Sequence, residues 1–184
     1  TFSIIKRDGT IENYKASKIG DAVSAAFASI GEVCPTEALE TLIAAIEKEL
    51  EGIAENGSVR VEQIQDNVEI ELMRASFYRQ ARRFILYREE RAKDRAYINE
   101  IEQTVGLEGM HRLLKDVQRD YPHLCKSFGK LVSKYHAFHK PSMTAEEGLH
   151  ALTRAAVECI TAEEPDWEFV AGRLYSFQND LNIR

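Results

Sequence analysis

The sequence predicts a mostly α-helical protein that begins with a small β-hairpin. Two observations support this prediction. Apolar residues recur every three or four positions through most of the chain, and the first fourteen residues alternate in polarity around a turn sequence. The chain has 184 residues, 44% hydrophobic and 29% charged, which is typical of a globular protein with a substantial core. That length suits one large domain or two small ones.

The predicted hairpin turns at Asp8-Gly9. Asp-Gly favours a two-residue turn because such turns need positive φ, which glycine adopts without steric cost. The cross-strand pairs expected from this turn are Arg7–Thr10, Ile5–Glu12 and Ser3–Tyr14. Strand alternation then gives one face with Arg7, Glu12 and Tyr14, and an opposite face with Ile4, Lys6 and Ile11.

Three cations gather near this turn and the helix that follows it. Lys6 and Arg7 are adjacent at the turn, and Lys18 lies at the start of the predicted helix, where Ser17 is the expected N-cap. Basic side chains beside a helix N-terminus suit the binding of a polyanion such as a phosphate chain. An ordinary solvent-exposed hairpin is the alternative that the residues alone leave open.

Four amphipathic helices are expected after the hairpin. The first ends at Gly31, and the second begins with Thr36 as N-cap and ends at Asn56-Gly57, where Gly57 suits a left-handed cap. The third begins near Val61, and the fourth runs from about Ser76 to Tyr97. The expected buried positions are Ile19, Val23, Phe27 and Ile30; Leu39, Leu42, Ile43, Ile46, Leu50 and Ile53; Ile64, Val68 and Leu72; and Phe77, Ala81, Phe84 and Ile85.

The rest of the chain is expected to be helical. Residues 96–106 are interpreted as a connector, and residues 107–184 as a second helical region. Thr144 is the expected N-cap of one of its helices, and Pro165-Asp166 opens the last one. The expected buried positions are Leu107, Met110, Leu113, Leu114 and Val117; Phe128, Leu131, Val132 and Tyr135; Leu149, Leu152, Ala156 and Ile160; and Trp167, Val170, Leu174 and Phe177.

Composition and missing motifs argue against several functional classes. The net charge of −6 disfavours a nucleic-acid partner, and no apolar run approaches the ~20 residues that span a membrane. Three widely spaced cysteines and the lack of a signal-peptide pattern favour a cytoplasmic protein with reduced thiols. The chain has no P-loop spacing, no Cys-x-x-Cys pair and no recognisable catalytic or metal-ligand set. We therefore expect no catalytic residue and no metal held by protein side chains.

Three blocks of sequence occur in an informative order. The first contains Lys6-Arg7-Asp8-Gly9 and Glu12 and continues to Lys18-Ile19; the second is residues 61–69, and the third residues 84–91. Together they resemble the ATP-cone, the nucleotide-sensing domain at the N-terminus of many ribonucleotide reductase large subunits. The resemblance covers roughly residues 3–95, and residues 1–95 are accordingly interpreted as a nucleotide-binding regulatory domain.

The resemblance implies an allosteric segment that binds ATP, which activates, or dATP, which inhibits, and couples this choice to oligomeric state. Mg²⁺ is expected to bridge the phosphate oxygens. The implied partners are the remainder of the large subunit, further copies in a homo-oligomer and the radical-generating small subunit. The segment itself is expected to be regulatory and non-catalytic.

The resemblance also assigns roles to individual residues. Lys6, Arg7, Lys18 and Arg88 would neutralise the phosphates, and Glu12 would lie near the sugar or order the basic side chains. The full set of residues implied to bind nucleotide is Ile4, Lys6, Arg7, Glu12, Tyr14, Lys18, Ile19, Val61, Ile64, Gln65, Tyr87, Arg88 and Arg91. Of these, Ile4, Ile19, Val61 and Ile64 would pack on the adenine.

The second half has two interpretations. Residues 155–158 and 164–174 are similar to the last two helices of a cone as they run into the helical N-terminal region of the reductase, but no second Lys-Arg-Asp-Gly sequence precedes them. Residues 107–184 are therefore either a degenerate second cone or the start of that helical region. The rival function is an ATP-cone transcriptional regulator of reductase genes, which the missing zinc ribbon disfavours.

Overall fold

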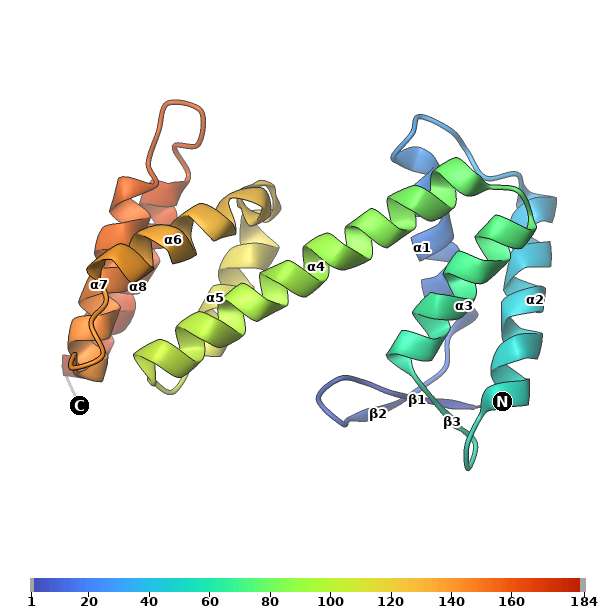
Figure 1. Ribbon diagram of the computed structural model, residues 1–184, viewed down its shortest axis with the longest axis horizontal. Helices are drawn as coiled ribbons and strands as arrows, with labels where there is room; N and C mark the ends of the chain where they lie inside the picture. The colour runs from blue at the N-terminus through green and yellow to red at the C-terminus, as the bar shows by residue number, and fades with distance from the viewer. Residues whose placement is uncertain (1, 183–184) are drawn as a thin grey trace. The chain divides into compact units, whose positions relative to one another are not determined.

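The chain forms two compact units, Thr1–Glu89 and Glu90–Arg184, and each has its own hydrophobic core (Figure 1). The computed structural model describes residues 2–182, so Thr1, Ile183 and Arg184 lie outside the described part. The mostly helical fold with an N-terminal β element is confirmed. None of the helices within residues 2–182 is long and apolar enough to cross a membrane.

The first unit combines a small sheet with four helices. Its strands are β1 (Ser3–Ile5), β2 (Ile11–Asn13) and β3 (Ser58–Arg60). Its helices are α1 (Ala16–Ala28), α2 (Thr36–Ile53), α3 (Val61–Arg74) and the beginning of α4 (Tyr78–Val105). Strand β1 is central, antiparallel to β2 and parallel to β3, and the sheet lies at one end of α1, α2 and α3 (Figure 1).

The core of the first unit follows the predicted helical stripes. Val23 of α1, Ile46 and Leu50 of α2 and Leu72 of α3 are fully buried. Burying such side chains contributes about 1.5–3 kcal/mol each, so these contacts hold the helices together. Two residues depart from the prediction. Ile30 lies in the turn after α1, which ends at Ala28, and is partly exposed. Ile53 is the last residue of α2 and is 39% exposed.

The predicted hairpin exists, but its register differs by one residue from the prediction. Ile4 pairs with Glu12, so the connecting loop has three residues, Arg7-Asp8-Gly9, rather than two. The Asp8 carboxylate accepts hydrogen bonds from the Thr10 amide at 3.0 Å and the Thr10 hydroxyl at 2.6 Å. Gly9 has φ +81°, which closes a three-residue hairpin loop with glycine in the left-handed region. The side-chain bonding of Asp8 thus favours a longer loop than the Asp-Gly pair alone predicts.

A register shift of one residue exchanges the two faces of a strand relative to its partner. Lys6 consequently shares a face with Glu12 and Tyr14, whereas Arg7 lies in the loop. The predicted grouping of Arg7 with Glu12 and Tyr14 is therefore wrong. The consequence for the candidate site is that Lys6, and not Arg7, reaches Glu12.

Strand β3 was not predicted, and its presence gives Gly57 a different role. Helix α2 ends at Ile53, and Asn56 (φ +50°) and Gly57 (φ +73°) form a tight turn between Glu55 and Ser58. Two consecutive residues with positive φ are typical of a type I′ turn. Gly57 therefore directs the chain into β3 instead of capping α2, and a strand of three residues is too short to show alternation in sequence.

Two of the three predicted N-caps are shifted. Helix α1 begins after Lys15 and α2 after Pro35, so Ser17 and Thr36 lie inside the first turns of their helices. Neither helix has a side-chain cap. The prediction for Thr144 is confirmed, because its hydroxyl accepts a hydrogen bond from the Glu147 amide at 3.2 Å.

The second unit is a bundle of helices. It contains the end of α4, α5 (Met110–Asp120), the 3₁₀ helix η1 (Pro122–Ser127), α6 (Phe128–Phe138), α7 (Ala145–Glu158) and α8 (Trp167–Asn182). Its core includes the predicted residues Met110, Leu131, Leu152 and Trp167, all fully buried. The predicted burial of Ile160 is wrong, since α7 ends before it and its side chain is partly exposed.

The segment 96–106 is more than a connector. Helix α4 continues through it to Val105, and Ile98, Ile101 and Val105 are buried in the core of the second unit. These apolar residues are three and four positions apart, the spacing of one helix face. Within residues 90–182 no strand is present, so this unit has no counterpart of the basic hairpin.

Candidate functional site

The hairpin and the start of α1 bring two ammonium groups onto one carboxylate. The Glu12 carboxylate lies 2.6 Å from Lys18 Nζ and 2.7 Å from Lys6 Nζ. Hydrogen bonds from Lys18 and then Lys6 lower the pKa of Glu12 to about 2, and the bond to Glu12 raises the pKa of Lys6. We call these three residues the hairpin cation cluster. It carries one positive charge in excess and opens to solvent, because Lys6 and Lys18 remain 45% and 54% exposed.

The backbone at the start of α1 adds to this positive character. Lys15 is the N-cap of α1 and provides no side-chain acceptor, so the first amides of the helix lack a side-chain cap. A helix N-terminus of this kind carries a partial positive charge and attracts anions. Lys18 projects from this first turn, which places a helix dipole and an ammonium group on the same side.

Arg7 links the hairpin loop to the beginning of α3. Its Nε lies 2.8 Å from a Glu62 carboxylate oxygen, and its terminal nitrogen donates to Gln65 Oε1 at 2.8 Å. Gln65, predicted to lie near the nucleotide, therefore joins the hairpin through Arg7. The adjacent cations of the sequence thus diverge: Lys6 bonds to Glu12 on β2, whereas Arg7 bonds to α3.

Arg88 reaches the same helix from α4. Its guanidinium lies 3.0 Å from Asp66 and also forms an ion pair with Glu69. Both acids are on α3, so Arg88 is doubly compensated in this structure. Sequence reasoning missed the α3 carboxylates, although positions 62, 66 and 69 lie on one helical face and could have been found from that spacing.

The predicted apolar contacts lie beneath the hairpin. Ile4, Ile19 and Ile64 are buried in the core of the first unit, and Val61 packs against that core. The Tyr14 ring packs at an angle of 41° to the Phe2 ring, with centroids 4.5 Å apart. Burial and then the neighbouring Glu47 carboxylate raise the pKa of Tyr14. These side chains form an apolar floor next to the hairpin cation cluster.

Two predicted residues lie elsewhere. Tyr87 is 59% exposed and lines a cavity of about 340 Å³ between α1 and α4, together with Ala22 and Phe84. Arg91 belongs to the second unit, where its guanidinium lies 3.6 Å from Asp94. The structure therefore groups Lys6, Glu12 and Lys18, joins Arg7 to Gln65, and connects Arg88 to Asp66 and Glu69 of α3.

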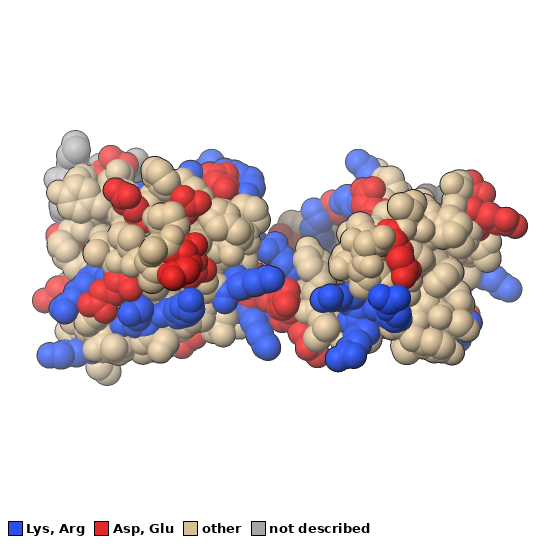
Figure 2. All heavy atoms as spheres, turned by 90° about the horizontal axis from the view of Figure 1, so that it is seen from above, with Lys and Arg blue, Asp and Glu red and all other residues tan. Residues whose placement is uncertain are grey.

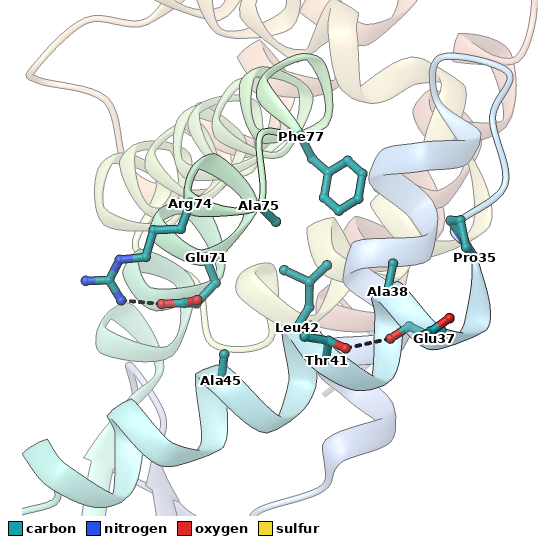
Figure 3. A pocket seen from close by; sticks show the side chains of 10 residues that line it. All are labelled: Pro35, Glu37, Ala38, Thr41, Leu42, Ala45, Glu71, Arg74, Ala75 and Phe77. Atoms are coloured by element: carbon teal, nitrogen blue, oxygen red, sulfur yellow. Dashed lines mark hydrogen bonds and ion pairs between the residues drawn. The ribbon is translucent and has the colours of Figure 1, made fainter.

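A separate groove of about 530 Å³ lies between α2 and α3 (Figure 3). Leu42 and Phe77 give it apolar walls, and the buried Glu71 at its edge is paired with Arg74 at 2.5 Å. None of the predicted nucleotide-binding residues lines this groove. Its charge and composition do not suit a phosphate chain, so the hairpin remains the candidate site.

Positive and negative side chains are mixed on one face of the molecule (Figure 2). On the face drawn in Figure 2, Lys and Arg side chains lie beside Asp and Glu side chains over both units. Within residues 2–182, no group of three or more His, Cys, Asp or Glu side chains is placed to hold a metal ion. A positively charged site in this chain is therefore a local feature built from a few residues.

Comparison of the sequence with known proteins identifies related families and relatives. Residues 2–93 match the model of the ATP cone domain. Over 184 residues the chain is 35% identical to the ribonucleoside-diphosphate reductase subunit alpha of Treponema pallidum, which aligns 98% of this chain with 22% of that protein. The protein of the same name from Chlamydia pneumoniae is 29% identical, over 94% of this chain and 19% of its own length.

A third relative follows the same pattern. The ribonucleoside-diphosphate reductase subunit alpha of Chlamydia trachomatis is 27% identical, over 95% of this chain and 19% of its own length. The chain thus spans roughly a fifth of the length of these relatives, in their N-terminal part. Both units are included in these alignments, whereas the family model covers the first unit and the following few residues of α4.

Proposed function

Because this chain belongs to the ATP-cone family, we propose that its first unit binds ATP or dATP as an allosteric effector of a ribonucleotide reductase large subunit. The family match and the reductase relatives support an allosteric nucleotide-binding regulatory region in this part of the chain. The observation that carries the finer proposal is the hairpin cation cluster, in which Lys6 and Lys18 converge on Glu12 beside the uncapped start of α1.

The phosphates would bind at this corner. Charge-assisted hydrogen bonds from Lys6 and Lys18, together with the first amides of α1, suit phosphate oxygens. Arg7 lies next to Lys6 in sequence and would extend the positive surface toward α3. Glu12 would then keep the two ammonium groups at the correct separation, because it already contacts both.

The base and sugar would lie on the apolar floor beneath the hairpin. Ile4, Ile19 and Ile64 form that floor, with Val61 and Tyr14 at its edge. An adenine ring placed there would be buried against aliphatic side chains, and Gln65 would offer a polar contact at the rim. Tyr87 and Arg91 face other surroundings, and the proposed site does not include them.

Mg²⁺ would enter with the nucleotide. Glu12, Glu62 and Asp66 are already bonded to Lys or Arg side chains and Asp8 accepts from Thr10, so the oxygen ligands would come from the phosphates and water. Bound to the phosphates, such an ion would supply part of the charge that neutralises them. The residues of this chain would contribute cationic contacts to the remaining phosphate oxygens.

Regulation requires ATP and dATP to favour different states of the molecule. The two ligands differ by one ribose hydroxyl, which a polar group at the rim can distinguish by leaving a hydrogen bond unmade. We propose that the difference is passed to the oligomeric state of the reductase through contacts with the rest of the large subunit and with the small subunit. The second unit, which lacks a basic hairpin, would act as an adaptor in these contacts.

Calorimetric titration of the 184-residue chain with ATP, dATP and adenosine, each with Mg²⁺, tests this function. We expect saturable binding of both triphosphates and much weaker binding of adenosine, because the site is built around cations. A folded chain that binds neither triphosphate would refute the proposal.

A further inference from the structure

Helix α3 presents a row of acids to two of the arginines of the first unit, Arg7 and Arg88. Glu62, Asp66 and Glu69 occupy positions i, i+4 and i+7, which form one stripe on a helix. Arg7 contacts the first of them, and Arg88 contacts the other two. We call these three acids the α3 acidic stripe. It extends about 10 Å along the helix axis, comparable to an extended triphosphate.

Charge is distributed unevenly between the two sides of the site. In the hairpin cation cluster, two ammonium groups share one carboxylate, so one positive charge is left over. On α3 the negative charges outnumber the positive ones, because Arg7 and Arg88 face three carboxylates. The guanidinium groups are therefore fully compensated without a ligand, and the site as a whole has no net charge.

We propose that the α3 acidic stripe is an internal competitor that occupies the guanidinium groups of Arg7 and Arg88 in place of phosphate and thereby sets the affinity for the nucleotide. This inference rests on the function proposed above. A phosphate chain anchored by Lys6 and Lys18 reaches the arginines only by displacing carboxylates that already bond to them. Binding of the triphosphate then releases α3 carboxylates from the hairpin loop and from α4.

Neighbouring contacts on α3 support a shared exchange. Gln65, which bonds to Arg7, directly precedes Asp66, which bonds to Arg88. Both guanidinium groups therefore contact side chains between positions 62 and 69, within about two turns of α3. The terminal phosphate, which lies farthest from the base, would make this exchange, so the competition weakens the binding of ATP more than that of AMP.

Removing the competing charges should strengthen binding, which is the opposite of the usual effect of mutating a site. Glu62 and Asp66 are exposed, and an exposed ion pair changes an equilibrium by factors of up to about five. We therefore expect Glu62→Gln to tighten ATP binding about threefold and the double variant Asp66→Asn/Glu69→Gln about tenfold. AMP should gain less than twofold in either variant.

The experiment is a calorimetric titration of the full 184-residue chain and these variants with ATP and with AMP at one fixed salt concentration. The matched control is Glu37→Gln/Glu40→Gln on α2, which removes the same charge at exposed positions away from the stripe. Arg88→Gln provides the second control. If the acids act through Arg88, Asp66→Asn/Glu69→Gln should no longer increase the affinity for ATP when it is combined with Arg88→Gln. A misfolded variant cannot mimic the expected gain in affinity.

The outcomes separate the two proposals. Unchanged or weaker ATP binding in both acidic-stripe variants would overturn the internal competitor while leaving nucleotide binding by the wild type intact. An equal gain in the α2 control would also overturn it, since the effect would then come from overall charge. A wild-type chain that does not bind ATP would instead overturn the proposed function on which this inference rests.

Discussion

Replacing the two lysines of the hairpin cation cluster should weaken triphosphate binding far more than nucleoside binding. Lys6→Ala reduces the charge of the cluster from an excess of one positive charge to neutrality, and Lys6→Ala/Lys18→Ala leaves Glu12 alone. Charge-assisted hydrogen bonds contribute about 1.5–3 kcal/mol, and we take the lower end because both lysines are about half exposed to water.

A loss of about 1.5 kcal/mol corresponds to about tenfold weaker ATP binding for each lysine and about hundredfold for the pair. Calorimetric titration with ATP and adenosine measures both effects, with Lys115→Ala on α5 as the control for removing an exposed positive charge. If ATP and adenosine lose affinity equally, these lysines maintain the fold of the hairpin and do not bind phosphate.

The other predictions concern the hairpin loop, the pKa of Glu12 and the second core. Gly9→Ala should lower the unfolding free energy by about 1–2 kcal/mol, because Gly9 has φ +81°. Gly52→Ala near the end of α2, where a Cβ meets open space, should raise it by about 0.5–1 kcal/mol. Melting temperatures of the two variants that shift in the same direction would contradict this. Because the pKa of Glu12 is lowered to about 2, its carboxylate stabilises the fold fully at pH values above its usual pKa of 4.5. This stabilisation is lost as the pH falls through about 2. An NMR titration of the Glu12 carboxyl carbon with a midpoint near pH 4.5 would show that the cluster does not form. Trp167→Ala should destabilise the second unit by about 3–5 kcal/mol, since the ring is fully buried beside Phe128; a loss below about 1 kcal/mol in denaturant unfolding would show that this core is not organised around Trp167.

The sequence was most informative where a pattern extended over several turns. Helical stripes such as Leu42, Ile46 and Leu50 predict burial because many repeats of the same spacing agree, and the structure confirms it. Strand β3 could not be found in this way, since three residues contain no repeat. Its position depends on parallel pairing with β1, a contact between residues more than fifty positions apart.

The hairpin illustrates a second limit. Asp8-Gly9 correctly marks a turn, but the length of the loop depends on the hydrogen bonds from Thr10 to the Asp8 carboxylate, which compete with the shorter turn. One residue of register decides whether Lys6 or Arg7 meets Glu12. Sequence identifies the basic residues of the site, whereas their partners follow from a side-chain interaction that no periodicity reveals.

The acids around the site show a third limit. Glu62, Asp66 and Glu69 have the spacing of a solvent-exposed helix face, which is their simplest interpretation from sequence. Only the packing of α4 and of the hairpin loop beside α3 brings Arg88 and Arg7 to them. The charge balance of the site is therefore a property of the tertiary structure.

The most direct test of the central claim is an NMR titration of the isotopically labelled 184-residue chain with ATP and Mg²⁺, followed through its backbone amide signals. We expect saturable shifts that concentrate at residues 4–12, at the start of α1 and in the first two turns of α3, with the helices α5 to α8 least affected. Shifts confined to α5–α8, or no saturable shift at the hairpin, would contradict the assignment of the nucleotide site to Lys6, Glu12 and Lys18.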